Sequence, residues 1–154
     1  MQEHIQNELA SFIANCDWEK IAPHFKEDAA YRVLDWIGCA VAGEHYPQVE
    51  IAQKYFIENG DQGNSTVIGH QTKCSPRTAA FLNGIAGHVC ELDDGHRTAI
   101  GHPGSIAVPT ALALGEHLNA SGADVLKAVI LGYEVFSRLG RTVNPSHYRT
   151  WHTT

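Results

Sequence analysis

Eighteen consecutive residues, 88–105, concentrate side chains that could do acid/base chemistry. Three carboxylates, three imidazoles and one guanidinium occur within this stretch: His88, Glu91, Asp93, Asp94, His96, Arg97 and His102. The stretch lies between two apolar segments, so its charges must be paired, hydrated in a cleft or shifted in pKa. Catalytic sites typically contain titratable groups whose pKa is shifted in this way. His102 is the best acid/base candidate, because an imidazole can both accept and donate a proton near neutral pH.

The second half of the stretch has the features of an anion-binding site. Residues 101–105 lead into a predicted helix, whose free backbone N–H groups and positive dipole end favour a carboxylate. The small residues Gly101, Gly104 and Ser105 allow a ligand to approach the backbone. Arg97 could add a bidentate grip. We therefore expect a substrate carboxylate to bind here.

Structural interpretations compete with these assignments. Asp93 and Asp94 could cap a helix end in a solvated turn, because Asp favours turns. His88 is interpreted as a histidine at the edge of the core. Cys39 and Cys90 are expected to be inert small hydrophobes within apolar helices. The remaining histidines before the tail are interpreted as surface or structural residues: His4, His24, His45, His70 and His117.

Composition excludes several other classes of protein. The 154 residues carry a formal net charge of -6 and no basic run, which argues against a nucleic-acid or anionic-membrane surface. No apolar stretch reaches the roughly 20 residues of a membrane span. The four cysteines are widely spaced and the N-terminus has no signal-sequence pattern, so we expect a cytoplasmic protein with reduced thiols.

Apolar periodicity predicts an all-α fold, a compact bundle of about six helices in one unit over residues 1–154. Helices are expected at 3–15, 25–42, 47–58, 76–90 and 106–118, with a last helix that starts after Ser121 and carries an apolar stripe from Val125 to Leu139. The only strand expected covers 66–68. The helix at 106–118 is apolar nearly all round, which predicts a central position, with Pro109 in its first turn.

Four segments of this sequence together resemble the MmgE/PrpD family. The segment ELDDGHRTAIGHPG, followed by an apolar helix with ALALGE, is similar to the family's acidic run and His-Pro helix start. Three further segments agree in order and spacing: LDWIGCAVAG at 34–43, AAFLNGIAGHVCELDD at 79–94 and ILGYEVFSRLG at 130–140. The resemblance covers most of the chain. It implies that the bundle is the N-terminal part of the family's helical domain.

The resemblance also implies a function. Members include 2-methylcitrate dehydratase, cis-aconitate decarboxylase and iminodisuccinate epimerase, lyases and isomerases that move a proton at a carbon beside a carboxylate. It implies a small di- or tricarboxylate substrate, with no cofactor and no metal. Asp93, His102 and His152 are predicted to be catalytic, the last because it matches a histidine in a later family segment. Glu91, Asp94, His96 and Arg97 are predicted to bind substrate.

The sequence departs from the family pattern in ways that keep alternatives open. Glu91 stands where many members have Asp, and Gly95-His96 replaces a Thr-Trp pair, so neither dehydratase nor decarboxylase activity transfers directly. Family members continue into a second, α/β domain, so we expect an incomplete enzyme that forms a homodimer or associates with that C-terminal portion. One alternative is an inactive fragment or interaction module. Another is a metal-dependent helical hydrolase, with ligands drawn from His88, Asp93, Asp94, His96 and His102.

Overall fold

The computed structural model describes residues 4–71 and 73–150. Within these residues, six α-helices make up most of the structure and confirm the predicted all-α class: α1 (Ile5–Ala14), α2 (Pro23–Gly43), α3 (Pro47–Glu58), α4 (Pro76–His88), α5 (Gly104–Leu118) and α6 (Gly122–Val143). Two short 3-10 helices, η1 (Trp18–Lys20) and η2 (His147–Arg149), and two strands, β1 (Ser65–Thr66) and β2 (Lys73–Cys74), complete it. No helix among the described residues is long and apolar enough to cross a membrane.

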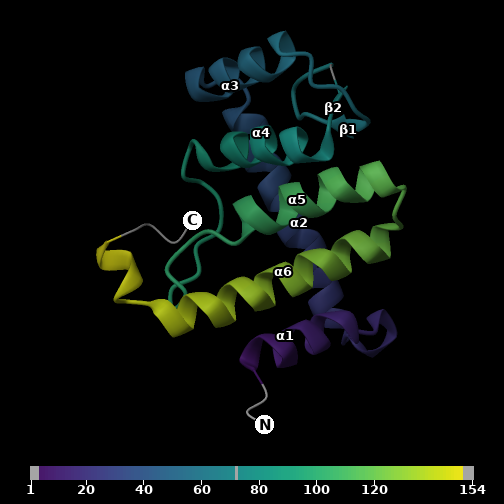
Figure 1. The fold of residues 1–154 in the computed structure, drawn as a ribbon, viewed down its shortest axis with the longest axis vertical. Coiled ribbons are helices and arrows are strands. Elements are labelled where there is room, and N and C mark those ends of the chain that lie inside the picture. Colours follow the sequence, from purple (N-terminus) through teal and green to yellow (C-terminus); the bar gives the residue numbers. More distant parts are fainter. Residues whose placement is uncertain (1–3, 72, 151–154) are drawn as a thin grey trace.

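Helices α4, α5 and α6 lie side by side, and α2 crosses behind them (Figure 1). The row is closed at one end by α3 and the two strands and at the other by α1 (Figure 1). The strands pair antiparallel, Ser65 with Cys74 and Thr66 with Lys73. The predicted strand at 66–68 therefore begins one residue earlier, and its partner was not predicted because a two-residue strand carries too little alternation to detect.

Two helices begin at the N-cap serines that the sequence predicted. The Ser75 hydroxyl accepts from the Thr78 N–H at the start of α4, and the Ser121 hydroxyl accepts from the Asp124 N–H at the start of α6. Both are capping interactions that satisfy an otherwise unpaired donor. Pro109 departs from expectation: α5 begins at Gly104, so this proline stands inside the helix instead of in its first turn.

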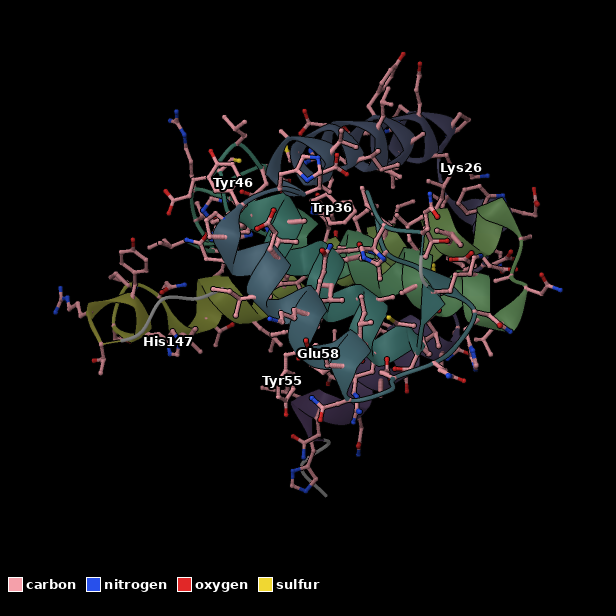
Figure 2. The ribbon with its side chains drawn as sticks, turned by 90° about the horizontal axis from the view of Figure 1, so that it is seen from above. Lys26, Trp36, Tyr46, Tyr55, Glu58 and His147 are labelled. Atoms are coloured by element: carbon pink, nitrogen blue, oxygen red, sulfur yellow. The ribbon has the colours of Figure 1, made fainter. Side chains whose placement is uncertain are left out.

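The main core joins α2, α3, α4, α5 and α6 around Trp36, which is 2% exposed (Figure 2). The core consists of Trp36, Ala40, Val49, Ala86, Val108, Ala111 and Val129. Gly87 is required at its centre, because a Cβ there would overlap the Trp36 indole. The predicted central position of α5 holds in part: Val108 and Ala113 are buried, but Ile106, Leu114 and Leu118 are exposed.

Candidate active site in the loop between two central helices

The loop at 89–103 joins α4 to α5 and is fixed by its own backbone and by α6. His96 and Gly101 form an antiparallel bridge, in which the His96 N–H donates to the Gly101 carbonyl at 2.9 Å. Ala99 is fully buried, and its carbonyl accepts from the Asn144 side chain just beyond α6. Glu91 and Ile100 have φ of 49° and 52°. Such left-handed backbone at non-glycine residues is costly and tends to cluster at functional sites.

Asp93 lies at the centre of a buried polar cluster. Its side chain is 0% exposed, and its carboxylate lies 3.0 Å from His88 Nδ1 and 3.4 Å from His102 Nδ1. The Ser105 hydroxyl donates to Asp93 Oδ2 at 2.5 Å. The two imidazole rings meet edge to face with centroids 4.7 Å apart. A buried carboxylate is costly unless it is hydrogen-bonded. His88 and Ser105 supply hydrogen bonds, and His102 lies at ion-pair distance.

The core helices hold this cluster in place. His88 is the last residue of α4, and Ser105 lies in the first turn of α5. The Trp36 indole N–H donates to the Ser105 hydroxyl at 3.3 Å, which ties the cluster to α2. The position of Asp93 therefore depends on the packing of three helices.

Asp94 points into a different environment from its neighbour Asp93. Its carboxylate accepts from Arg32 Nη1 on α2 at 3.0 Å and from the Gly104 N–H at 3.0 Å. The start of α5 is therefore already capped by a carboxylate of the chain itself. The expectation that this helix end is free to bind a substrate carboxylate is wrong at Gly104, because a nearby Asp in the same loop reaches it first.

Arg32, Asp94 and Tyr133 connect α2, the loop and α6. Arg32 also donates from Nε to Asp28 at 2.8 Å, and its guanidinium lies 5.0 Å from the centroid of the Tyr133 ring. Burial, followed by the charge of Asp94, raises the pKa of the Tyr133 hydroxyl, although Arg32 acts in the opposite direction. Burial lowers the pKa of Arg32, but its interactions with Asp28 and Tyr133 outweigh this and raise it. The phenol therefore stays neutral and the guanidinium charged.

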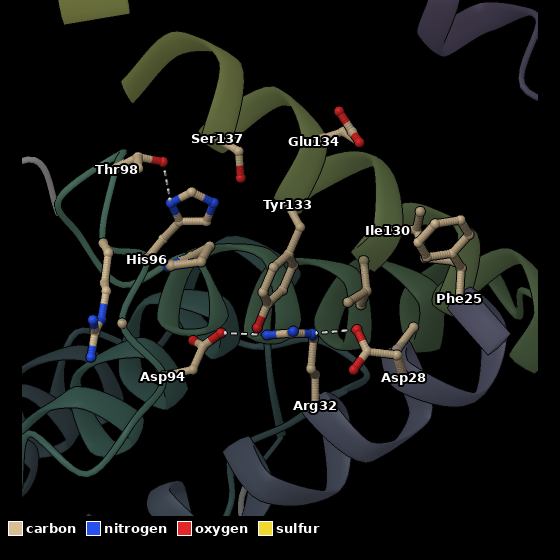
Figure 3. Close-up of a pocket in the computed structure, with 15 residues that line it drawn as sticks. Phe25, Asp28, Arg32, Asp94, His96, Thr98, Ile130, Tyr133, Glu134 and Ser137 are labelled. Carbon is tan, nitrogen blue, oxygen red and sulfur yellow. Dashed lines mark hydrogen bonds and ion pairs between the residues drawn. The ribbon is translucent and has the colours of Figure 1, made fainter. Parts of the chain in front are cut away.

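This group forms one wall of a cavity of about 600 Å³, shown in Figure 3. Three of its side chains are cationic or can become so by protonation: Arg32, His96 and Arg97. The other lining residues are Phe25, Asp28, Ala29, Asp94, Gly95, Thr98, Pro103, Val129, Ile130, Tyr133, Glu134 and Ser137. Cavities of 300–1,000 Å³ are typical of small-molecule sites.

The backbone of its own loop fixes the ring of His96. Its Nδ1 accepts from the Ala99 N–H at 3.1 Å and lies 3.4 Å from the Thr98 hydroxyl (Figure 3). A ring nitrogen that accepts a backbone N–H carries no proton, so a neutral His96 has its proton on Nε2. The ring can therefore present an Nε2–H donor to the cavity.

The predicted site residues thus fall into two groups. Asp93 and His102 lie in the buried cluster, whereas Asp94, His96 and Arg97 line the cavity. The groups are adjacent, since Asp94 follows Asp93 and Pro103, also a lining residue, follows His102. Glu91 is exposed. His152 lies outside the described residues.

Sequence reasoning missed Arg32, Tyr133 and the partnership of His88 with Asp93. Arg32 and Tyr133 are single polar positions on amphipathic helices, where a solvated face is the ordinary interpretation. Only the crossing of α2 and α6 shows that both face Asp94. His88 was placed at the core edge, and its side chain is indeed 34% exposed. Its spacing of five residues from Asp93 was the one available signal.

One group of described residues has the composition of a metal site. His88, Asp93 and His102 each offer a ligand atom, and these atoms lie within 4.8 Å of one another. Two imidazoles and a carboxylate are suitable ligands for zinc. A cation would, however, displace the contacts that both imidazoles make with Asp93. Asp94 and His96, which were also considered as ligands, face the cavity instead.

The structure thus defines a helical domain in which a buried Asp-His cluster lies beside a cavity of small-molecule size. The family model for the MmgE/PrpD N-terminal domain matches residues 7–154. This chain therefore belongs to the MmgE/PrpD family, as its sequence motifs indicated.

Curated relatives agree with this assignment. The chain is 30% identical to the cis-aconitate decarboxylase-like protein oryM of Aspergillus oryzae, over 97% of this chain and 33% of that protein. It is 32% identical to the cis-aconitate decarboxylase of Aspergillus terreus, over 96% and 32% respectively. With the human cis-aconitate decarboxylase it shares 35% identity over 70% of this chain and 23% of that protein. The chain thus spans about one third of the length of the first two relatives.

Proposed function

We propose that this chain is the helical domain of a lyase or isomerase that transfers a proton at a carbon beside a carboxylate in a small di- or tricarboxylic acid. Family membership supports a dehydratase or decarboxylase type, and relatives named cis-aconitate decarboxylase favour the latter. The observation that carries the proposal is the buried Asp93 carboxylate held against the His102 imidazole, next to a cavity with three groups that can bind anions. The reaction needs no cofactor in this proposal.

His102 would accept and return the substrate proton. An ionised carboxylate at Nδ1 orients an imidazole and stabilises its positively charged form, so the Asp93 contact suits this role. Positioned general acid/base groups typically contribute 10²–10⁴-fold to a rate. In this proposal His152 assists as a second catalytic histidine.

The cavity would hold the substrate carboxylates. Arg97 is exposed at its rim, and His96 can offer its Nε2–H from a fixed ring. Arg32 is a weaker candidate for a direct contact, because Asp28 and Asp94 already engage its guanidinium. Asp94 would act by holding Arg32 and the start of α5, and Glu91 would reach the substrate from the other end of the loop. Association with a second copy, or with the C-terminal portion found in family members, would complete the site.

A binding experiment tests the cavity on the 154-residue chain itself. Cis-aconitate is titrated into ¹⁵N-labelled protein, and the amide signals of residues 95–98 are followed by NMR. We expect saturable shifts there and about 10- to 100-fold weaker binding for Arg97→Gln, because a charge-assisted hydrogen bond contributes roughly 1.5–3 kcal/mol. Arg141→Gln, at the exposed end of α6, is the matched control. Absence of saturable shifts with every di- and tricarboxylate tried would refute the proposal.

The metal-dependent hydrolase is the second candidate, and the convergence of His88, Asp93 and His102 is the observation in its favour. We expect no stoichiometric metal in the purified protein and no change of the thermal midpoint on chelation. A bound metal stabilises the folded state that binds it, so its removal would lower the midpoint. Elemental analysis and thermal scans with and without a chelator provide the test. One zinc ion per chain would favour the hydrolase.

A further inference from the structure

We infer that Asp93 is a positioning residue for two imidazoles, and that His88 is the second member of the acid/base group. This inference rests on the proposed function and adds His88 to it. The Asp93 side chain is 0% exposed, so a substrate in the cavity cannot touch it. Asp93 can therefore affect a proton transfer only through the side chains that contact its carboxylate.

Both imidazoles turn Nδ1 toward Asp93, but only His88 is within hydrogen-bond distance, and His102 lies at ion-pair distance. His88 presents Nδ1 to both carboxylate oxygens, at 3.0 and 3.1 Å, and His102 presents Nδ1 to Oδ2 at 3.4 Å. A carboxylate that is ionised accepts only. The Ser105 hydroxyl donates to the same group, and the Trp36 indole N–H donates to that hydroxyl in turn. The hydrogen bonds place the proton of His88 on Nδ1. For His102 the same tautomer is favoured because a bare Nδ1 lone pair would face an ionised carboxylate oxygen at 3.4 Å. Nε2 is then the atom where a proton enters or leaves each ring.

His88 differs from His102 in the surface that it reaches. It lines a groove of about 570 Å³ between α4 and α5, together with Phe81, Ile85 and Pro109. The groove is separate from the cavity that holds Arg97. A proton taken up at Nε2 of either ring creates an imidazolium, and the same ionised carboxylate compensates its charge. The cluster can thus hold one extra proton on either ring, and only His88 lines the groove.

The tautomer of each ring tests this inference without any need for turnover. Long-range ¹H–¹⁵N correlation spectra of the chelator-treated chain distinguish a proton on Nδ1 from one on Nε2, and His88→Asn and His102→Asn assign the signals. We expect the neutral ring of His88 and that of His102 to carry the proton on Nδ1. His96 is the internal control, with its proton on Nε2 when neutral, because its Nδ1 accepts the Ala99 N–H.

Asp93→Asn supplies the decisive variant. An amide offers one acceptor and one donor where the carboxylate offers two acceptors, so one of the two rings is expected to move its proton to Nε2 while His96 stays unchanged. Ser105→Ala removes a donor to Asp93 and should leave both tautomers as they are. If Asp93→Asn does not fold, the spectra of the wild type and of Ser105→Ala still show which ring nitrogen of His88 and of His102 carries the proton. A wild-type ring with an unprotonated Nδ1 at His88 or His102 would overturn the inference, whatever the binding experiment shows.

Discussion

The roles of Asp93 and Asp94 are separated by a single peptide bond. Consecutive side chains in this irregular loop point in different directions, so Asp93 enters the buried cluster while Asp94 reaches Arg32 and the start of α5. Neither is a solvated turn residue, although Asp94 does cap a helix. The general expectation for Asp in turns was therefore correct for one of the pair only.

His102→Asn is expected to lower kcat by about 100-fold or more in a catalytically active form that contains this domain, because removal of a general acid/base group has that effect. The circular-dichroism spectrum should stay native, since the side chain is partly exposed and lies outside the helices. The matched control is His117→Asn, which changes an exposed histidine near the end of α5. An unchanged kcat in folded His102→Asn protein would remove this residue from the mechanism.

At the scale of the elements, the site depends on how closely α2 and α4 approach. Gly87→Ala places a Cβ against the Trp36 indole, and overpacking of a core typically costs about 1–3 kcal/mol. We expect lower stability in urea denaturation, together with changed signals from His88, the next residue in α4. Gly38→Ala is the control, because nothing lies within 4 Å of its Cβ. That substitution should stabilise α2 by about 1 kcal/mol through helix propensity.

Tyr133 links the stability of the bundle to alkaline pH. Its pKa is raised in the folded protein, so the unfolded chain loses this proton at a lower pH than the folded chain does. The protonated Tyr133 therefore contributes to the free energy of unfolding fully below the ordinary tyrosine pKa. This contribution is lost as the pH rises through the pKa of Tyr133 in the folded protein. Urea midpoints should therefore fall more steeply with pH above about 10 for the wild type than for Tyr133→Phe. For the exposed Tyr55, we expect the wild type and Tyr55→Phe to give parallel plots of urea midpoint against pH. Parallel plots for the wild type and Tyr133→Phe would contradict the expectation for Tyr133.

At the scale of the whole molecule, α5 and α6 leave an apolar surface exposed. A groove of about 510 Å³ runs between them, lined by residues such as Ile106, Leu114, Val135 and Leu139. Three of these side chains are between 46% and 54% exposed: Ile106, Leu114 and Leu139. Extended apolar patches mark interaction surfaces or aggregation-prone regions.

The 154-residue chain alone is expected to self-associate or bind a hydrophobic dye, and to be inactive on methylcitrate and cis-aconitate. Water has access to the cavity in this form, which weakens electrostatic preorganisation. Light scattering, dye fluorescence and a turnover assay check this, with the Aspergillus terreus enzyme as the positive control. Leu114→Lys should reduce dye binding, whereas Lys127→Ala, at the opposite end of α6 from Leu139, should not. A dye-free monomer that turns over a carboxylic acid would contradict the expectation.

The sequence by itself determined the helices, the caps at Ser75 and Ser121 and the loop that carries the titratable residues. These features are local, because they depend on apolar periodicity and on residues three or four positions apart. Pro109 was placed wrongly in relation to its helix, since boundaries depend on packing as well as on propensity. The family motifs were also readable, because they lie within continuous segments.

Only the tertiary structure decided which titratable side chains meet. Arg32 is 62 residues from Asp94 in the chain, and Trp36 is 69 residues from Ser105, so no periodicity or spacing links them. Their contacts arise where α2 crosses α4, α5 and α6. The same crossing buries Asp93, which turns an acidic turn residue into a shared partner of two imidazoles. A buried carboxylate must satisfy its hydrogen bonds within reach, and only the packed helices determine which groups lie within reach.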